Sequence, residues 1–117
     1  MNLSTDMKVR VVRLRVPEDG PEGVAKKVEK ALDEYEGDEG KRENEALQFC
    51  VEVSPNAARM SIADARRLKR AVEPFRARVK RSCPGHVVRV PNRGFMAAAR
   101  TALFFFRPDV PTKVEIF

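Results

Sequence analysis

His86 is the only histidine of the chain, and it follows Cys83 at a Cys-x-x-His spacing that could serve a metal ion or a nucleophile. Tetrahedral zinc needs four protein ligands, or three and an open position, and the only other cysteine is Cys50. A catalytic thiol needs a base that a third group orients, and neither paired acids nor a nucleophilic serine motif lies near this pair in the sequence. We therefore predict no metal site, no cofactor and no enzymatic activity. Cys83 is expected to close the apolar face of a helix, and His86 to begin a strand.

Basic side chains between Ser61 and Cys83 give the strongest functional signal. Cations along one exposed face of a helix can follow a phosphate backbone, release its counterions and bind in a salt-sensitive way. From Arg59 to Arg93 eleven basic residues stand against two acidic ones, whereas from Glu18 to Glu45 eleven acidic residues stand against five basic ones. We predict a nucleic-acid-binding surface formed by Arg66, Arg67, Arg70, Arg76, Lys80, Arg81 and Arg93.

This segregation of charge also has other interpretations. The basic segment could meet the acidic segment of its own chain, an acidic surface of another protein, or a second copy packed head to tail as a homodimer. If the partner is DNA or RNA, we expect contact with the backbone rather than sequence readout, because the outward positions of the first two strands carry no aromatic side chain that could stack on bases.

The apolar segment Phe95–Phe106 supports an alternative function. Arg100 and Thr101 are its only polar side chains, so as a helix it must be covered on more than one side. If the chain itself does not cover it, the protein is a small interaction module, such as an adaptor, inhibitor or assembly subunit. Just before this segment, Asn92-Arg93-Gly94 could cap the helix and hold an anion, but it matches neither a P-loop nor a dinucleotide fingerprint and is more simply a capped turn.

The helix that carries the basic residues has a clear pattern. Its apolar residues recur at steps of three and four, which places them on one stripe that faces the core. Ser61 and Asp64 predict a capping box at its start, and Pro84-Gly85 predicts its end. Pro74 lies inside the pattern and predicts a kink or two abutting helices. The stripe consists of Ala65, Leu68, Val72, Phe75, Val79 and Cys83.

Alternating apolar residues predict the strands. In the first strand the alternation changes phase between Val11 and Val12, which we interpret as a β-bulge. An amphipathic helix with the apolar residues Val24, Val28, Ala31, Leu32 and Tyr35 is expected to follow it and to end at Gly37. The predicted strands are Met7–Val16, Ala46–Val53, Ala58–Met60, His86–Val90 and Thr112–Phe117.

Strands with one polar face are typical of antiparallel sheets that helices cover on one side only. The predicted fold is therefore α+β: a two-layer sandwich with a mostly antiparallel sheet of four to five strands and two to three helices, ferredoxin-like with a C-terminal helix and strand added.

Composition limits the class of protein. The length of 117 residues fits one domain, residues 1–117, and a content of 43% hydrophobic and 34% charged residues is that of a globular chain. No apolar run approaches the roughly 20 residues that span a bilayer, so no membrane partner is expected. Met1–Asp6 lacks the features of a secretory signal, which predicts a cytoplasmic protein with two free thiols.

Overall fold

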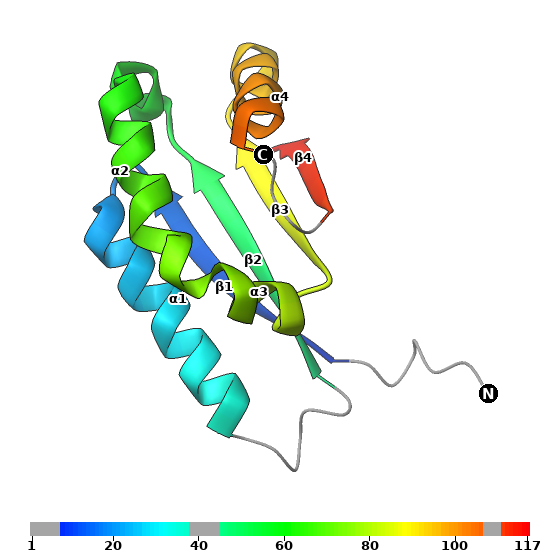
Figure 1. The fold of residues 1–117 in the computed structure, drawn as a ribbon. Coiled ribbons are helices and arrows are strands. Elements are labelled where there is room, and N and C mark those ends of the chain that lie inside the picture. Colours follow the sequence, from blue (N-terminus) through cyan, green and yellow to red (C-terminus); the bar gives the residue numbers. More distant parts are fainter. Residues whose placement is uncertain (1–7, 38–44, 107–110) are drawn as a thin grey trace, which may run out of the picture.

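Strands and helices alternate along the chain in the computed structural model, which describes residues 8–37, 45–106 and 111–117 (Figure 1). The four strands form one sheet in the order β1-β2-β3-β4. The strands are β1 (Lys8–Val16), β2 (Glu45–Val53), β3 (Gly85–Val90) and β4 (Thr112–Ile116). The helices are α1 (Gly20–Gly37), η3 (Pro55–Arg59), α2 (Ile62–Val72), η4 (Glu73–Phe75), α3 (Arg76–Ser82) and α4 (Arg93–Phe106).

Every pair of neighbouring strands is parallel. Each connection moves one strand further across the sheet in the same direction, and right-handed crossovers of this kind place all their helices on one side. Figure 1 shows α1, α2, α3 and α4 on the same side of the sheet. The described molecule therefore has two layers, with one face of the sheet covered by helices and the other face open.

The predicted antiparallel, ferredoxin-like sheet is wrong, because all four strands run in the same direction. The polar positions of β2 and β3 were correctly assigned to one face, but alternation reports only that one face of a strand is buried. It does not report the direction of the neighbouring strand. A one-sided layer of helices gives a parallel sheet the same alternating pattern.

Two local predictions are also wrong. The β-bulge in β1 is absent, since its register with β2 runs without interruption from Lys8 opposite Glu45 to Val16 opposite Val53. The change of phase is accommodated by leaving Val9 and Val11 on the open face, where they are 53% and 48% exposed. The predicted strand Ala58–Met60 is instead part of the 3₁₀-helix η3, which Ser54 caps by accepting a hydrogen bond from the amide of Asn56.

The core lies between the sheet and the helices α1, α2 and α3. Leu32 of α1 and Leu47 of β2 are fully buried, and the predicted apolar residues of α1 lie among them. Four residues of the predicted stripe, Leu68, Val72, Phe75 and Val79, pack against this cluster, and Cys83 belongs to it. The stripe therefore faces the core as predicted.

The ends and the break of the basic helix are also as predicted. Ser61 and Asp64 form the capping box, with Asp64 N donating to Ser61 Oγ at 3.1 Å and Ser61 N donating to Asp64 Oδ2 at 3.0 Å. Near Pro74 the α-helix is interrupted by the 3₁₀ turn η4, so that α2 and α3 abut. We call the continuous run α2, η4 and α3 the basic helix run.

The C-terminal part adds β3, α4 and β4. Asn92 caps α4, its Oδ1 accepting a hydrogen bond from the amide of Phe95 at 3.1 Å, which confirms the capped turn. Phe95 is half-buried. The side chains of residues 101–106, on which the prediction of a covered or interacting apolar segment depends, lie outside the described part of the chain.

Candidate nucleic-acid interface

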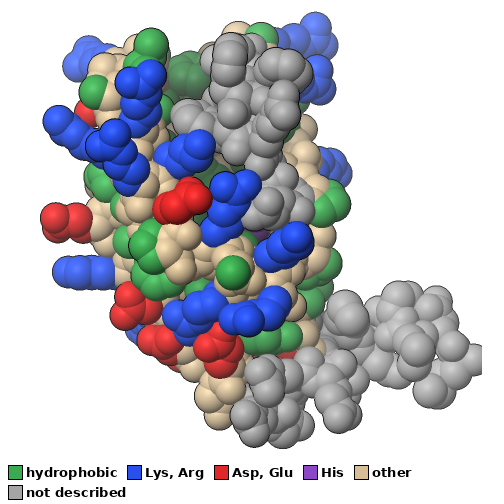
Figure 2. Space-filling model, viewed as in Figure 1, with side chains coloured by type: hydrophobic (Ala, Val, Ile, Leu, Met, Phe, Trp, Pro, Cys, Tyr) green, Lys and Arg blue, Asp and Glu red, His purple; other side chains and the backbone are tan. Residues whose placement is uncertain are grey.

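The basic helix run turns one side to the core and the opposite side to solvent. We define its basic face by the six predicted residues Arg66, Arg67, Arg70, Arg76, Lys80 and Arg81. All are exposed except Arg76, which is half-buried. Figure 2 shows Lys and Arg side chains spread along this side of the molecule, over α2 and α3. The structure therefore brings these six predicted residues onto one surface.

Few acids neutralise the basic face. Arg67 Nη1 lies 3.9 Å from Asp64 Oδ1, and Arg76 Nη1 lies 3.4 Å from Glu73 Oε1. Exposed pairs of this kind within one helix contribute little and are easily exchanged for another anion. Among the described residues, Arg66, Arg70, Lys80 and Arg81 form no ion pair. Most of the charge on this face is therefore available to a partner.

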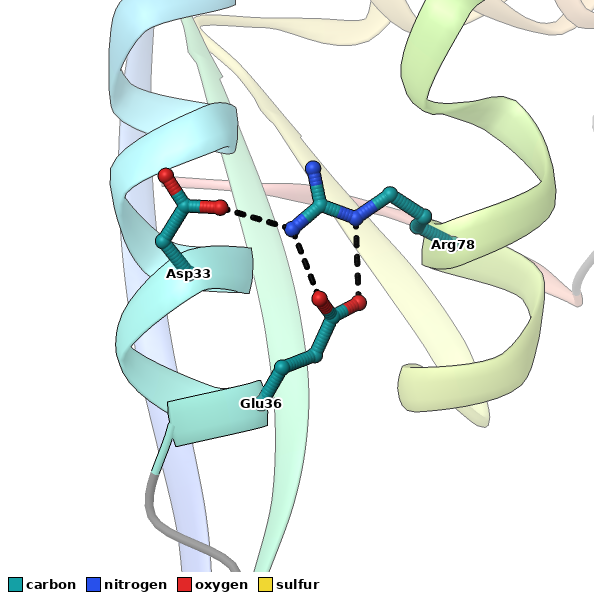
Figure 3. Close-up of polar contacts among 3 residues, drawn as sticks. All are labelled: Asp33, Glu36 and Arg78. Atoms are coloured by element: carbon teal, nitrogen blue, oxygen red, sulfur yellow. Dashed lines mark hydrogen bonds and ion pairs between the residues drawn. The ribbon is translucent and has the colours of Figure 1, made fainter.

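Arg78 behaves differently from the other cations of α3. Its Nη2 lies 2.7 Å from Asp33 Oδ1 and 2.8 Å from Glu36 Oε2, and its Nε donates to Glu36 Oε1 at 3.0 Å (Figure 3). Hydrogen bonds and charge attraction from these two carboxylates hold the pKa of Arg78 above its ordinary value. At this position the acidic helix α1 does neutralise the basic helix run, as the alternative interpretation of the charge pattern proposed.

The clamp made by Arg78 was not foreseen as a distinct feature. Asp33 and Glu36 are three residues apart on α1, so they lie on one side of that helix and can meet a single guanidinium. This spacing was readable from the sequence, but its partner was not, because α1 and α3 come together only in the fold. The clamp links α3 to α1 through side chains of both helices.

Arg93 is not part of the basic face. It is the first residue of α4, which contacts β3 and β4, and its side chain is exposed. The predicted set of seven residues therefore divides into six on the basic helix run and one on another helix.

Cys83 and His86 are in contact, but their surroundings are those of side chains packed in the core. Cys83 Sγ is 3.5 Å from His86 Nδ1 and donates a hydrogen bond to the carbonyl of Gly85 at 2.9 Å. Burial raises the pKa of the Cys83 thiol and lowers the pKa of His86, and both shifts favour the neutral forms. The His86 ring meets the ring of Phe49 edge-on. Among the described residues, no three or more His, Cys, Asp or Glu side chains lie close enough together to hold a metal ion.

A cavity of about 270 Å³ lies at the C-terminal end of β1 and was not anticipated. Its lining is mostly apolar but includes Asp64 and Arg67, and Arg67 also belongs to the basic face. Its volume is just below the roughly 300 to 1,000 Å³ of typical small-molecule sites. The residues around it are Arg15, Val16, Pro17, Gly20, Pro21, Val24, Met60, Asp64, Arg67 and Leu68.

Comparison of the chain with protein-family models, with curated proteins and with solved structures found no match. In the described part of the chain, none of the helices combines the length and apolar character needed to cross a bilayer.

Proposed function

We propose that this protein is a non-enzymatic nucleic-acid-binding module that contacts the phosphate backbone through its basic face. The observation that carries the proposal is the set of exposed cations Arg66, Arg70, Lys80 and Arg81, which form no ion pair within the described residues. They project from a helix run whose opposite side packs on the core. The fold therefore holds their backbone in place while their charge stays available.

The dimensions of the basic face suit a polyanion. At a helical rise of 1.5 Å per residue it extends about 22 Å from Arg66 to Arg81. One strand of B-DNA places about six phosphates along that length. The face carries six cationic side chains and no aromatic one, which supports backbone contact rather than sequence readout.

The proposal predicts a steep dependence on salt. If each of the six side chains meets one phosphate, the slope of log K against log salt should be about −5 for a duplex and about −4 for a single strand. The experiment is a titration of labelled single- and double-stranded DNA and RNA at low and moderate ionic strength. Absence of binding at low salt would contradict the proposal.

A matched variant pair localises the binding. The double substitution Arg66→Glu with Arg70→Glu changes the net charge as much as Lys26→Glu with Lys30→Glu, and all four side chains are exposed. Only the first pair should remove most of the affinity, since Lys26 and Lys30 belong to α1. Equal losses would mean that overall charge, rather than the basic face, governs binding.

An acidic protein surface is the competing partner for the same face, because it offers carboxylates in place of phosphates. Polyglutamate and a nucleic acid of equal charge, compared at one ionic strength, separate the two. Stronger binding of the nucleic acid supports the proposal.

A further inference from the structure

The open face of the sheet is unusual for parallel strands. Sheets in which all strands are parallel are almost always covered on both faces. Here the helices α1 to α4 lie on one side only (Figure 1). The register assigns to the open face Val9, Val11, Arg13 and Arg15 of β1, Ala46, Gln48, Cys50 and Glu52 of β2, Gly85, Val87 and Arg89 of β3, and Lys113 and Glu115 of β4.

One row of charges crosses this face from edge to edge. Arg15 lies opposite Glu52, Glu52 opposite Arg89, and Arg89 opposite Glu115. The signs alternate strictly across the four strands. Within the chain, Arg89 Nε donates to Glu115 Oε1 at 2.8 Å. The row is neutral as a whole and is only half-buried or exposed.

When a row of four charges of alternating sign is turned end for end and placed over an identical row, every charge faces a charge of opposite sign. A two-fold axis parallel to the strands, midway between β2 and β3, brings β1 of one copy over β4 of the other. Arg15 then faces Glu115 of the second copy, and Glu52 faces its Arg89. A two-fold axis perpendicular to the strands would instead place this row over the end of the sheet that carries Val9 and Ala46.

We propose that the open face binds a second copy of this chain, with the two-fold axis parallel to the strands. The interface is isologous, so each unlike-charge contact forms twice. Between the charged row and Gln48, the centre of the face is apolar, with Cys50 buried and Val87 half-buried. The two parallel sheets thus supply for each other the second covering layer that the described chain lacks.

The size of the face predicts a weak dimer. Four strands about 4.8 Å apart and roughly six residues long cover on the order of 400 Å² per copy. The total of roughly 800 Å² lies at the low end of specific interfaces. In addition, Arg13 faces Lys113 of the second copy, which places like charges at the two edges. We expect dimers at high micromolar concentration and low salt, and monomers on dilution.

A mixing experiment tests the geometry. Glu52→Arg and Arg89→Glu each turn the central contacts into like-charge pairs, so each variant alone should dimerise at least tenfold more weakly than the wild type. Mixed together, the two variants regain opposite charges at both central contacts and should form a heterodimer. Sedimentation equilibrium measures all three species, and far-UV circular dichroism verifies that both variants are folded.

A second variant does not depend on the stability of the first two. Arg13→Glu replaces the like-charge contact with Lys113 of the second copy by an attractive one, and the exposed position of Arg13 should leave the fold intact. Its dimer should be severalfold tighter than that of the wild type. The proposal is overturned by a wild type that stays monomeric at 1 mM concentration and low salt, by variants that do not pair when mixed, or by an Arg13→Glu dimer that is no tighter. Capture of nucleic acid on this face, weakened by Arg13→Glu, would also overturn it.

Discussion

The helix-covered and open sides of the sheet present two different kinds of charged surface. On the basic face the exposed side chains are of one sign, and Arg66, Arg70, Lys80 and Arg81 form no ion pair among the described residues. On the open face the signs alternate from strand to strand along the row from Arg15 to Glu115, in which Arg89 and Glu115 are already paired. A surface of one sign attracts a polyanion at a distance, whereas an alternating surface selects a partner by register. The charge of the basic face therefore suits attraction of a partner, and the charge of the row on the open face suits alignment of one.

The largest expected difference between the two sides is in packing. Leu47→Ala removes a fully buried side chain on the covered face of β2 and should lower the free energy of unfolding by about 3 to 5 kcal/mol. Gln48→Ala, the next residue on the open face, should change it by less than about 0.5 kcal/mol. Urea unfolding of both variants measures the contrast. Similar losses would show that the open face is packed as tightly as the covered one.

The next largest effect should be on binding. Arg66→Glu with Arg70→Glu should weaken the affinity for nucleic acid about 100-fold at low salt, because two attractive contacts become repulsive. The thermal midpoint should hardly change, since both side chains lie off the stripe that packs on the core. Fluorescence anisotropy and thermal denaturation measure the two quantities. A variant that unfolds readily would show that these arginines are structural.

A smaller effect is expected from the clamp between α3 and α1. Arg78→Ala leaves Asp33 and Glu36 without their shared cation and should lower the thermal midpoint. Arg81→Ala, which removes an exposed arginine on the same helix, should lower it less. Differential scanning calorimetry at low and high salt compares the two variants. If both behave alike, the clamp does not hold α3.

The smallest effect is a dependence of stability on pH. Because burial lowers the pKa of His86 in the folded state, the unfolded chain takes up a proton first as the pH falls through about 6.5. The free energy of unfolding should therefore be level above pH 7 and decrease below pH 6.5. His86→Gln should remove this decrease, since the chain has no other histidine. Urea unfolding between pH 5.5 and 7.5 tests this, and an unchanged profile in the variant would contradict the assignment to His86.

The sequence allowed the α-helices, the capping box of the basic helix run and the core stripe to be predicted, because these depend on residues close together in the chain. Ser61 with Asp64, the interruption at Pro74 and the stripe from Leu68 to Cys83 are examples. The parallel direction of the strands could not be predicted, since the alternation in β2 records only which of its faces is covered.

The candidate sites also differ in how far the sequence could predict them. The six residues of the basic face share one helix run, so their spacing alone predicted a common surface. The clamp of Arg78 and the row from Arg15 to Glu115 each join elements that meet only in the fold. The row also requires the register of four strands, which no local pattern specifies.

The order of the strands in the sheet follows their order in the chain. Among the described strands, each pairs only with the one immediately before it and the one immediately after it in the chain. No strand has to wait for a distant partner or be inserted between two strands already paired. The sheet can therefore grow in one direction while the chain leaves the ribosome, with β1 and β2 pairing before β3 is added, and β3 before β4.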